Sequence, residues 1–190
     1  LVASHTHHGP VLELKDRVGF GKGRFDDTLK YLKDLPGMLS ATIIAASEKL
    51  QPAKLGVATA EVPYNRNRHT KRKPAPRDSH LTVIRFDDPQ GKPLAILVNF
   101  TGHPVMTNNR ILKFSADYPG FMMNQVQQKL GVPCVFMQGA SGDMSVNADG
   151  KGPKEFGQLL GEKVTELANG IVSVDAEKPS LQAKTEQFHF

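Results

Sequence analysis

Two short runs without charged residues, 94–98 and 132–137, constrain the fold of this chain more than any other feature. Continuously apolar runs of this length are typical of strands that are covered on both faces. Between them, Met122, Val126 and Leu130 recur at helical spacing, and Gly131 offers a helix end. A strand, a helix and another strand in this order predict an α/β fold with a mixed sheet and helices packed on it.

The remaining patterns predict further elements around these three. The spacing of apolar residues, the turn residues and the helix caps predict strands at 53–62, 80–86 and 93–100, and helices at 39–50, 115–130 and 153–171. A helix is also expected from Asp26, with Pro36 and Gly37 interrupting it before residue 39. The stripe of Leu39, Ile43, Ala46 and Leu50 is expected to be buried.

Length and composition favour one domain over residues 1–190. No apolar run approaches the roughly 20 residues of a membrane span. The net charge of +5 points weakly to an anionic partner or surface. The single cysteine, Cys134, excludes an internal disulfide and is expected to be a buried, inert thiol. Both ends look cut, because 1–3 and 187–190 read as strands, so a piece of a longer protein is expected.

A histidine run follows the apolar residues at the start of the chain. His5, His7 and His8 lie within residues 4–10. In an extended segment, side chains two residues apart point the same way, so His5 and His7 can serve one site together. The alternative is a turn of solvated histidines.

Three expected strands end in polar turns, which lie at His5, at His103 and in 138–147. If these strands are parallel neighbours, the turns meet at the carboxyl ends of the strands, where α/β proteins usually carry their active sites. Histidines from distant segments are typical zinc ligands, and a catalytic zinc takes about three protein ligands and a water. The alternative for His103 is a capped turn before Pro104.

The turn at 138–147 also contains two candidate nucleophiles. Ser141 and Ser145 flank Gly142 and Asp143, but the glycine spacing does not match the Gly-x-Ser-x-Gly elbow. Turn residues that bond their own backbone are the alternative for both serines.

A basic loop occupies residues 63–79, and the glycine-rich stretch 19–23 is another expected loop without a phosphate-binding pattern. Six cations in the basic loop, over 64–77, make an anion-binding module one hypothesis and a solvated loop the other. No nucleic-acid recognition motif accompanies them, so no nucleic-acid partner is expected.

Taken in order, five segments of the chain resemble the neutral and alkaline non-lysosomal ceramidases. The segments are His5-Thr6-His7-His8-Gly9-Pro10, Asn65-Arg66-Asn67, Gly102-His103-Pro104, Ser115-Ala116-Asp117 and Gly142-Asp143-Met144-Ser145-Val146-Asn147. They match motifs of the amino-terminal catalytic domain of that family and extend over most of the chain, from residue 4 to about 170. Three positions, His8, Asn67 and Val146, depart from the family motifs.

The resemblance implies a part of a larger ceramidase-like catalytic domain, with His5 and His103 as ligands of Zn²⁺. It implies catalytic roles for His7, Arg66 and Ser145 in hydrolysis of the amide bond of an N-acylsphingosine-like lipid. The family's other zinc ligands, a glutamate and a tyrosine, would lie beyond residue 190. A lipid amide partner, a peripheral membrane contact, and a secreted or periplasmic location are implied in the same way. A degenerate, non-catalytic ceramidase-like domain remains the alternative.

Overall fold

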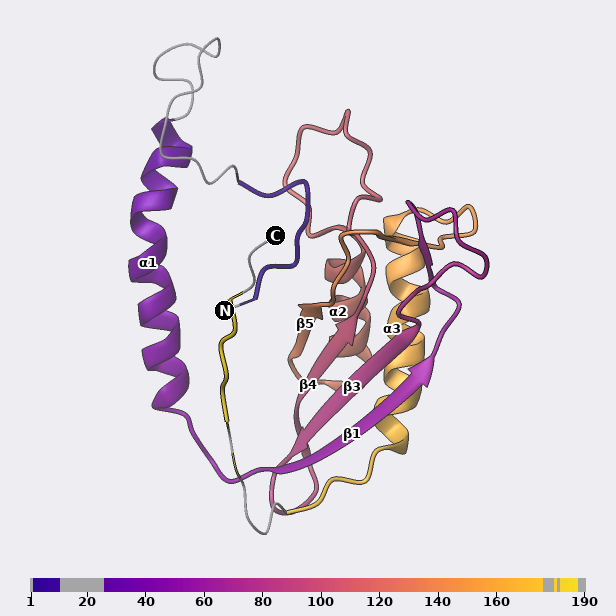
Figure 1. Cartoon of the computed structure of the whole chain (residues 1–190). Coiled ribbons are helices and arrows are strands. Elements are labelled where there is room, and N and C mark those ends of the chain that lie inside the picture. Colours follow the sequence, from indigo (N-terminus) through magenta and orange to yellow (C-terminus); the bar gives the residue numbers. More distant parts are fainter. Residues whose placement is uncertain (1, 11–25, 176–179, 181, 188–190) are drawn as a thin grey trace.

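The computed structural model describes residues 2–10, 26–175, 180 and 182–187 (Figure 1). Its main sheet contains β1 (Lys54–Glu61), β3 (His80–Asp87), β4 (Pro93–Phe100) and β5 (Cys134–Gln138) in the order β1-β3-β4-β5. β3 pairs antiparallel with both β1 and β4, whereas β4 and β5 are parallel. The predicted mixed sheet of an α/β fold is therefore confirmed, and β4 has its expected bounds.

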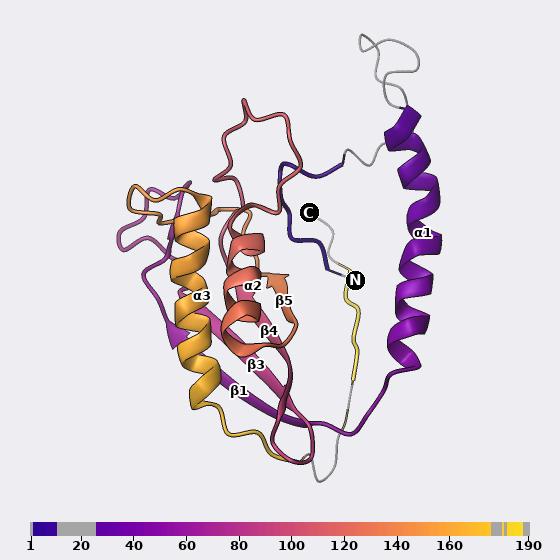
Figure 2. The same ribbon diagram turned by 180° about the vertical axis from the view of Figure 1, so that it is seen from behind.

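Helices α2 (Asp117–Leu130) and α3 (Pro153–Gly170) pack side by side on one face of this sheet (Figure 2). The alternation of the strands turns Leu81, Val83, Val98 and other apolar side chains towards these helices, where they are fully buried. Tyr118, Met122 and Val126 from α2 and Phe156, Leu160 and Val164 from α3 fill the other side of the core. The apolar spacing of these helices predicted their buried faces correctly.

Helix α1 (Asp26–Ser47) contradicts two expectations. It continues through Pro36 without a break and buries none of its residues, and Ile43 is 68% exposed. One missing N–H removes a single helical hydrogen bond, which the surrounding turns tolerate here. Apolar periodicity shows which face of a helix could be buried, but not whether another element covers it. In the structure, no other described element covers this face of α1 (Figure 1).

The chain start also differs from the expectation. Residues 2–6 form no strand, and His5 has a left-handed backbone with a φ of 64°. Only two of the three expected strands, β4 and β5, are therefore parallel neighbours. The side-chain alternation of a strand does not explain how His5 and His7 meet.

The basic loop and the turn at 138–147 contain two short strands that were not predicted. β2 (Asn65–Asn67) pairs antiparallel with β6 (Met144–Val146). Three residues are too few to show a period, so only this long-range pairing makes them strands. β6 also bridges in parallel to His103, which brings three polar segments together.

Cys134 is buried, and this burial raises the pKa of its thiol to about 12, as expected for an inert core cysteine. Among the described residues, none of the helices combines the length and the apolar composition that a bilayer crossing requires. The glycine-rich loop at 19–23 and most of the strand expected at 187–190 lie outside the described residues.

Candidate metal centre

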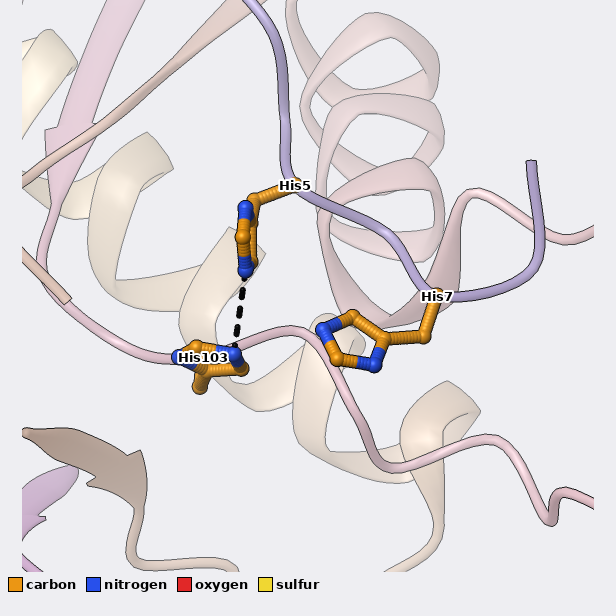
Figure 3. A group of neighbouring side chains, drawn as sticks. All are labelled: His5, His7 and His103. Atoms are coloured by element: carbon orange, nitrogen blue, oxygen red, sulfur yellow. Dashed lines mark hydrogen bonds between the residues drawn. The ribbon is translucent and has the colours of Figure 1, made fainter. Parts of the chain in front are cut away.

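Three imidazoles converge beyond the carboxyl end of β4. The nitrogens that His5, His7 and His103 can offer to a metal all lie within 4.8 Å of one another. His5 Nε2 and His103 Nε2 are 3.1 Å apart although 98 positions separate the residues (Figure 3). The His7 ring centroid is 5.2 Å from each of the other two. The expected meeting of these histidines is therefore present in the structure.

His103 has a defined orientation and tautomer. Its side chain is buried, and its Nδ1 lies 2.9 Å from the carbonyl oxygen of Ser141. Because a carbonyl oxygen can only accept, Nδ1 carries the proton and donates a hydrogen bond to the Ser141 carbonyl. The lone pair of the neutral ring is therefore on Nε2. That lone pair faces His5. Ser141 thus contributes its carbonyl oxygen to the site, a role that its sequence context did not reveal.

The backbone before His103 is held closely by its neighbours. The Gly102 carbonyl accepts hydrogen bonds from the Tyr118 hydroxyl at 2.6 Å and from Gln138 Nε2 at 3.1 Å. A Cβ at Gly102 would approach Phe100 and Val146 to 2.9 Å, so only glycine fits here without a shift. The buried Asn65 amide donates to the Thr101 carbonyl at 2.6 Å and secures the strand end.

The histidine run is fastened to the segment before α2. Thr6 Oγ1 donates to the Ser115 carbonyl at 2.7 Å, and the Ser115 N–H donates to the His8 carbonyl at 3.1 Å. These two bonds and the turn at residues 7–9 present His5 and His7 to His103. His8 points elsewhere, with Nδ1 3.3 Å from the Lys113 carbonyl.

The electrostatic environment favours the neutral form of His5. Desolvation, followed by the nearby imidazoles of His103 and His7 and the Arg68 guanidinium, lowers the pKa of His5. A neutral imidazole is the form that binds a metal.

The donor set fits zinc. Imidazole nitrogen is a common zinc ligand, and two such ligands about 2.1 Å from a tetrahedral ion lie roughly 3.4 Å apart. The spacing of 3.1 Å between His5 Nε2 and His103 Nε2 is close to this value. Without a cation, the His5 Nε2–H donates a hydrogen bond to the His103 Nε2 lone pair, and zinc would take the place of that proton.

The strand register brings Ser145 next to His103 and Arg66 next to Ser145. Ser145 is paired with Arg66 across β2 and β6 and with His103 through an isolated bridge. Paired residues carry their side chains on the same face, about 5 Å apart. Arg66 is exposed and Ser145 is half-buried.

Arg68 is a site residue that the sequence analysis did not single out. Its Nη2 donates to the Gly142 carbonyl at 2.9 Å and lies 3.3 Å from His103 Nδ1. Both nitrogens are donors, so we interpret the second distance as a close approach of a cation. Because Arg68 lies two residues after Arg66, strand alternation would have placed both on one face, but no strand was expected there.

Comparison with known proteins gives a consistent picture. The chain is 27% identical over 177 residues to neutral ceramidase B of Dictyostelium discoideum, covering 79% of this chain and 24% of that protein. No family model matches the chain.

Solved structures show a similar fold. The neutral ceramidase from Pseudomonas aeruginosa superposes with a TM-score of 0.61 at 22% identity, covering 76% of this chain and 26% of that one. A ceramidase complexed with C2 gives a TM-score of 0.60 at 21% identity, covering 76% of this chain and 25% of that one. This chain therefore spans about a quarter of the length of the relatives it matches.

Proposed function

Because this chain is related to the neutral ceramidases over about four-fifths of its length, we propose that it is part of a zinc-dependent amidohydrolase. The substrate in this proposal is an N-acylsphingosine-like lipid, and the products are a fatty acid and a sphingoid base. The observation that carries the proposal is the convergence of His5, His7 and His103, whose nitrogens lie within 4.8 Å of one another.

His5 and His103 are the proposed zinc ligands, through their Nε2 atoms. The bond from His103 Nδ1 to the Ser141 carbonyl supports this role, since it fixes the ring orientation and leaves Nε2 free. When bound, zinc would polarise the amide carbonyl and supply a hydroxide at neutral pH. The lowered pKa of His5 favours the neutral imidazole, whose Nε2 would bind zinc once its proton has left that nitrogen.

His7, Arg66 and Ser145 are the proposed catalytic residues. His7 is exposed beside the other two rings, so its imidazole can give a proton to the leaving amine. The Arg66 guanidinium can donate to the oxyanion that develops on the carbonyl. The Ser145 hydroxyl, paired in register with both Arg66 and His103, can hold the amide in place.

Arg68 has a positioning role in this proposal. Its guanidinium ties β2 to the Gly142 carbonyl, and the Arg68 N–H donates to the Asp143 carbonyl at 2.8 Å. The neighbouring Ser141 carbonyl orients His103. An anion-binding module separate from the histidines would need the basic loop to lie away from them, and the 3.3 Å distance from Arg68 Nη2 to His103 Nδ1 argues against that alternative.

The lipid substrate and the relationship to ceramidases together favour a secreted or periplasmic protein that works at a membrane surface. The location and the action at a membrane surface are both inferred from the resemblance to this family.

Hydrolysis of a soluble, short-chain N-acylsphingosine after loading with zinc tests the proposal. We expect the wild-type protein to release sphingosine. The variant His103→Ala should neither retain zinc nor release sphingosine. His69→Ala is the matched control, because His69 is exposed in the basic loop outside the histidine cluster.

Equal turnover by wild type and His103→Ala would contradict the proposed metal role. A wild-type protein that binds zinc and hydrolyses no amide would support the degenerate domain instead.

A further inference from the structure

The loop between His103 and α2 exposes large apolar side chains at the histidine end of the molecule. Leu112 is 95% and Phe114 80% exposed, and Ile111 keeps 46% of its surface exposed. Figures 1 and 2 show this loop, residues 105–114, projecting beyond the carboxyl end of β4. Clustered apolar exposure of this kind marks interaction surfaces.

The loop is continuous with the metal centre. A cavity of about 970 Å³ is lined on one side by His7, His8 and Gly9 and on the other by residues of 105–114. The contact of His8 Nδ1 with the Lys113 carbonyl joins the two walls. A lipid held by this loop therefore has a short path to His7.

Positive charge is interleaved with the apolar residues. Arg110 and Lys113 flank Ile111 and Leu112, and all four are exposed. Neither 105–114 nor the basic stretch 64–77 contains an aspartate or a glutamate. Both segments lie at the upper end of the molecule in Figure 1. Exposed apolar side chains among cations match the chemistry of an anionic lipid surface.

We propose that residues 105–114 dock this protein on an anionic lipid bilayer. Leu112 and Phe114 enter the interface, and Arg110 and Lys113 bind lipid phosphates. This inference rests on the proposed function, because a lipid amide substrate resides in such a surface. The cations of 64–77 strengthen the attraction over longer range.

The charges of the loop favour an anionic bilayer over a second copy of this protein as the partner of its apolar side chains. A second copy of this loop would bring Arg110 and Lys113 against the same cations, which is unfavourable because neither loop carries an acidic residue. An anionic bilayer instead supplies phosphates for the cations and an acyl boundary for Leu112 and Phe114.

Sedimentation with lipid vesicles tests the inference, in EDTA so that no metal is required. We expect binding to mixed phosphatidylcholine and phosphatidylglycerol vesicles that weakens with salt. The double variant Leu112→Ser, Phe114→Ser should bind about tenfold more weakly. Leu50→Ser and Val172→Ser are matched controls, because both residues are over 80% exposed and lie outside the loop.

A second variant, Arg110→Gln with Lys113→Gln, leaves the apolar residues in place and should remove the preference for anionic vesicles. A wild-type protein that binds neither anionic nor neutral vesicles would overturn the inference. Equal binding by wild type and the double serine variant would do the same. Self-association in ultracentrifugation that depends on Leu112 and Phe114, without vesicle binding, would identify a second copy as the occupant.

Vesicle binding and hydrolysis are separate measurements. Binding that persists in a protein without hydrolytic activity supports the docking loop and contradicts only the proposed function. An active protein that does not bind vesicles contradicts only the docking loop.

Discussion

The proton on His103 Nδ1 determines what this residue can do. The Ser141 carbonyl fixes that proton, so the Nε2 lone pair faces His5 and is available to a cation. Arg68 Nη2 lies 3.3 Å from His103 Nδ1, and its bond to the Gly142 carbonyl secures the turn that contains Ser141. The site therefore depends on backbone carbonyls as much as on the three imidazoles.

Arg68→Lys should lower zinc affinity about tenfold, which is the usual cost of losing an orienting partner of a metal ligand. Lysine keeps the charge but lacks the guanidinium fork that reaches the Gly142 carbonyl. Calorimetric titration with zinc measures the effect, with Arg72→Lys as the matched control in the same loop. Unchanged affinity would show that Arg68 does not position His103.

Ser145→Ala should slow amide hydrolysis about a hundredfold, as expected for loss of one preorganised hydrogen-bond donor. Zinc content should stay the same, because Ser145 is a neighbour of His103 and no ligand in the proposal. Turnover and metal analysis of the same preparation test this, with Ser40→Ala on α1 as the control. Release of zinc would identify Ser145 as a ligand.

Sequence reasoning identified His5, His7 and His103 but not the groups that orient them. The histidines stand out through residue type and motif, and they do meet in the structure. The Ser141 carbonyl and the Arg68 contact arise from the path of the backbone, which no local pattern encodes.

At the scale of elements, α2 and α3 approach each other through glycine. A Cβ at Gly157 would lie 2.6 Å from the Tyr118 carbonyl oxygen and from Phe121 Cβ, whereas one at Gly170 would meet nothing within 4 Å. The Tyr118 ring below this contact fills the core and donates to Gly102 beside His103. Helix packing thus supports the metal centre.

Gly157→Ala should destabilise the protein by about 1–3 kcal/mol, because an overpacked helix contact must move apart. Gly170→Ala should be neutral or stabilising by up to about 1 kcal/mol, since alanine favours helix and has room there. Urea unfolding of the two variants gives this comparison. Equal stability of both would mean that the helices are not in close contact at Gly157.

A partly buried ion pair between Arg85 and Asp87 lies at the end of β3, and Arg85 also links this end to α3. Burial raises the pKa of Asp87, but hydrogen bonds from Arg85 and Ser173 and the Arg85 charge outweigh burial and lower it. Arg85 Nε lies 2.8 Å from the Asp87 carboxylate, and its Nη1 donates to the Ala168 carbonyl.

Asp87→Asn should therefore cost about 1.5–3 kcal/mol at pH 7, the usual range for hydrogen bonds to charged groups. A lowered folded-state pKa gives stability that is complete above the ordinary value of 3.8 and is lost as pH falls through the folded value. Urea unfolding of wild type and variant should differ at pH 7 and converge in stronger acid. A difference independent of pH would exclude this linkage.

The main strands and the two packed helices could be predicted because their apolar periods match what they bury. β4 has the expected bounds, and the buried stripes of α2 and α3 were identified correctly. β2 and β6 were missed because three residues show no period. The prediction of a break in α1 at Pro36 was wrong, because the helix continues through this residue.

At the scale of the whole molecule, the fold brings together segments that begin and end far apart in sequence. The histidine run meets His103 beyond β4, while β2 and β6 bring Arg66 and Ser145 to the same end. The mixed sheet was predictable, but the meeting of these loops required its parallel β4–β5 pair and the anchoring of Thr6 to Ser115.

Anomalous diffraction from zinc-soaked crystals tests the central claim most directly. We predict one strong zinc peak about 2.1 Å from both His5 Nε2 and His103 Nε2. A zinc peak bound by other residues, or no peak beside these two nitrogens at saturating zinc, would contradict the account.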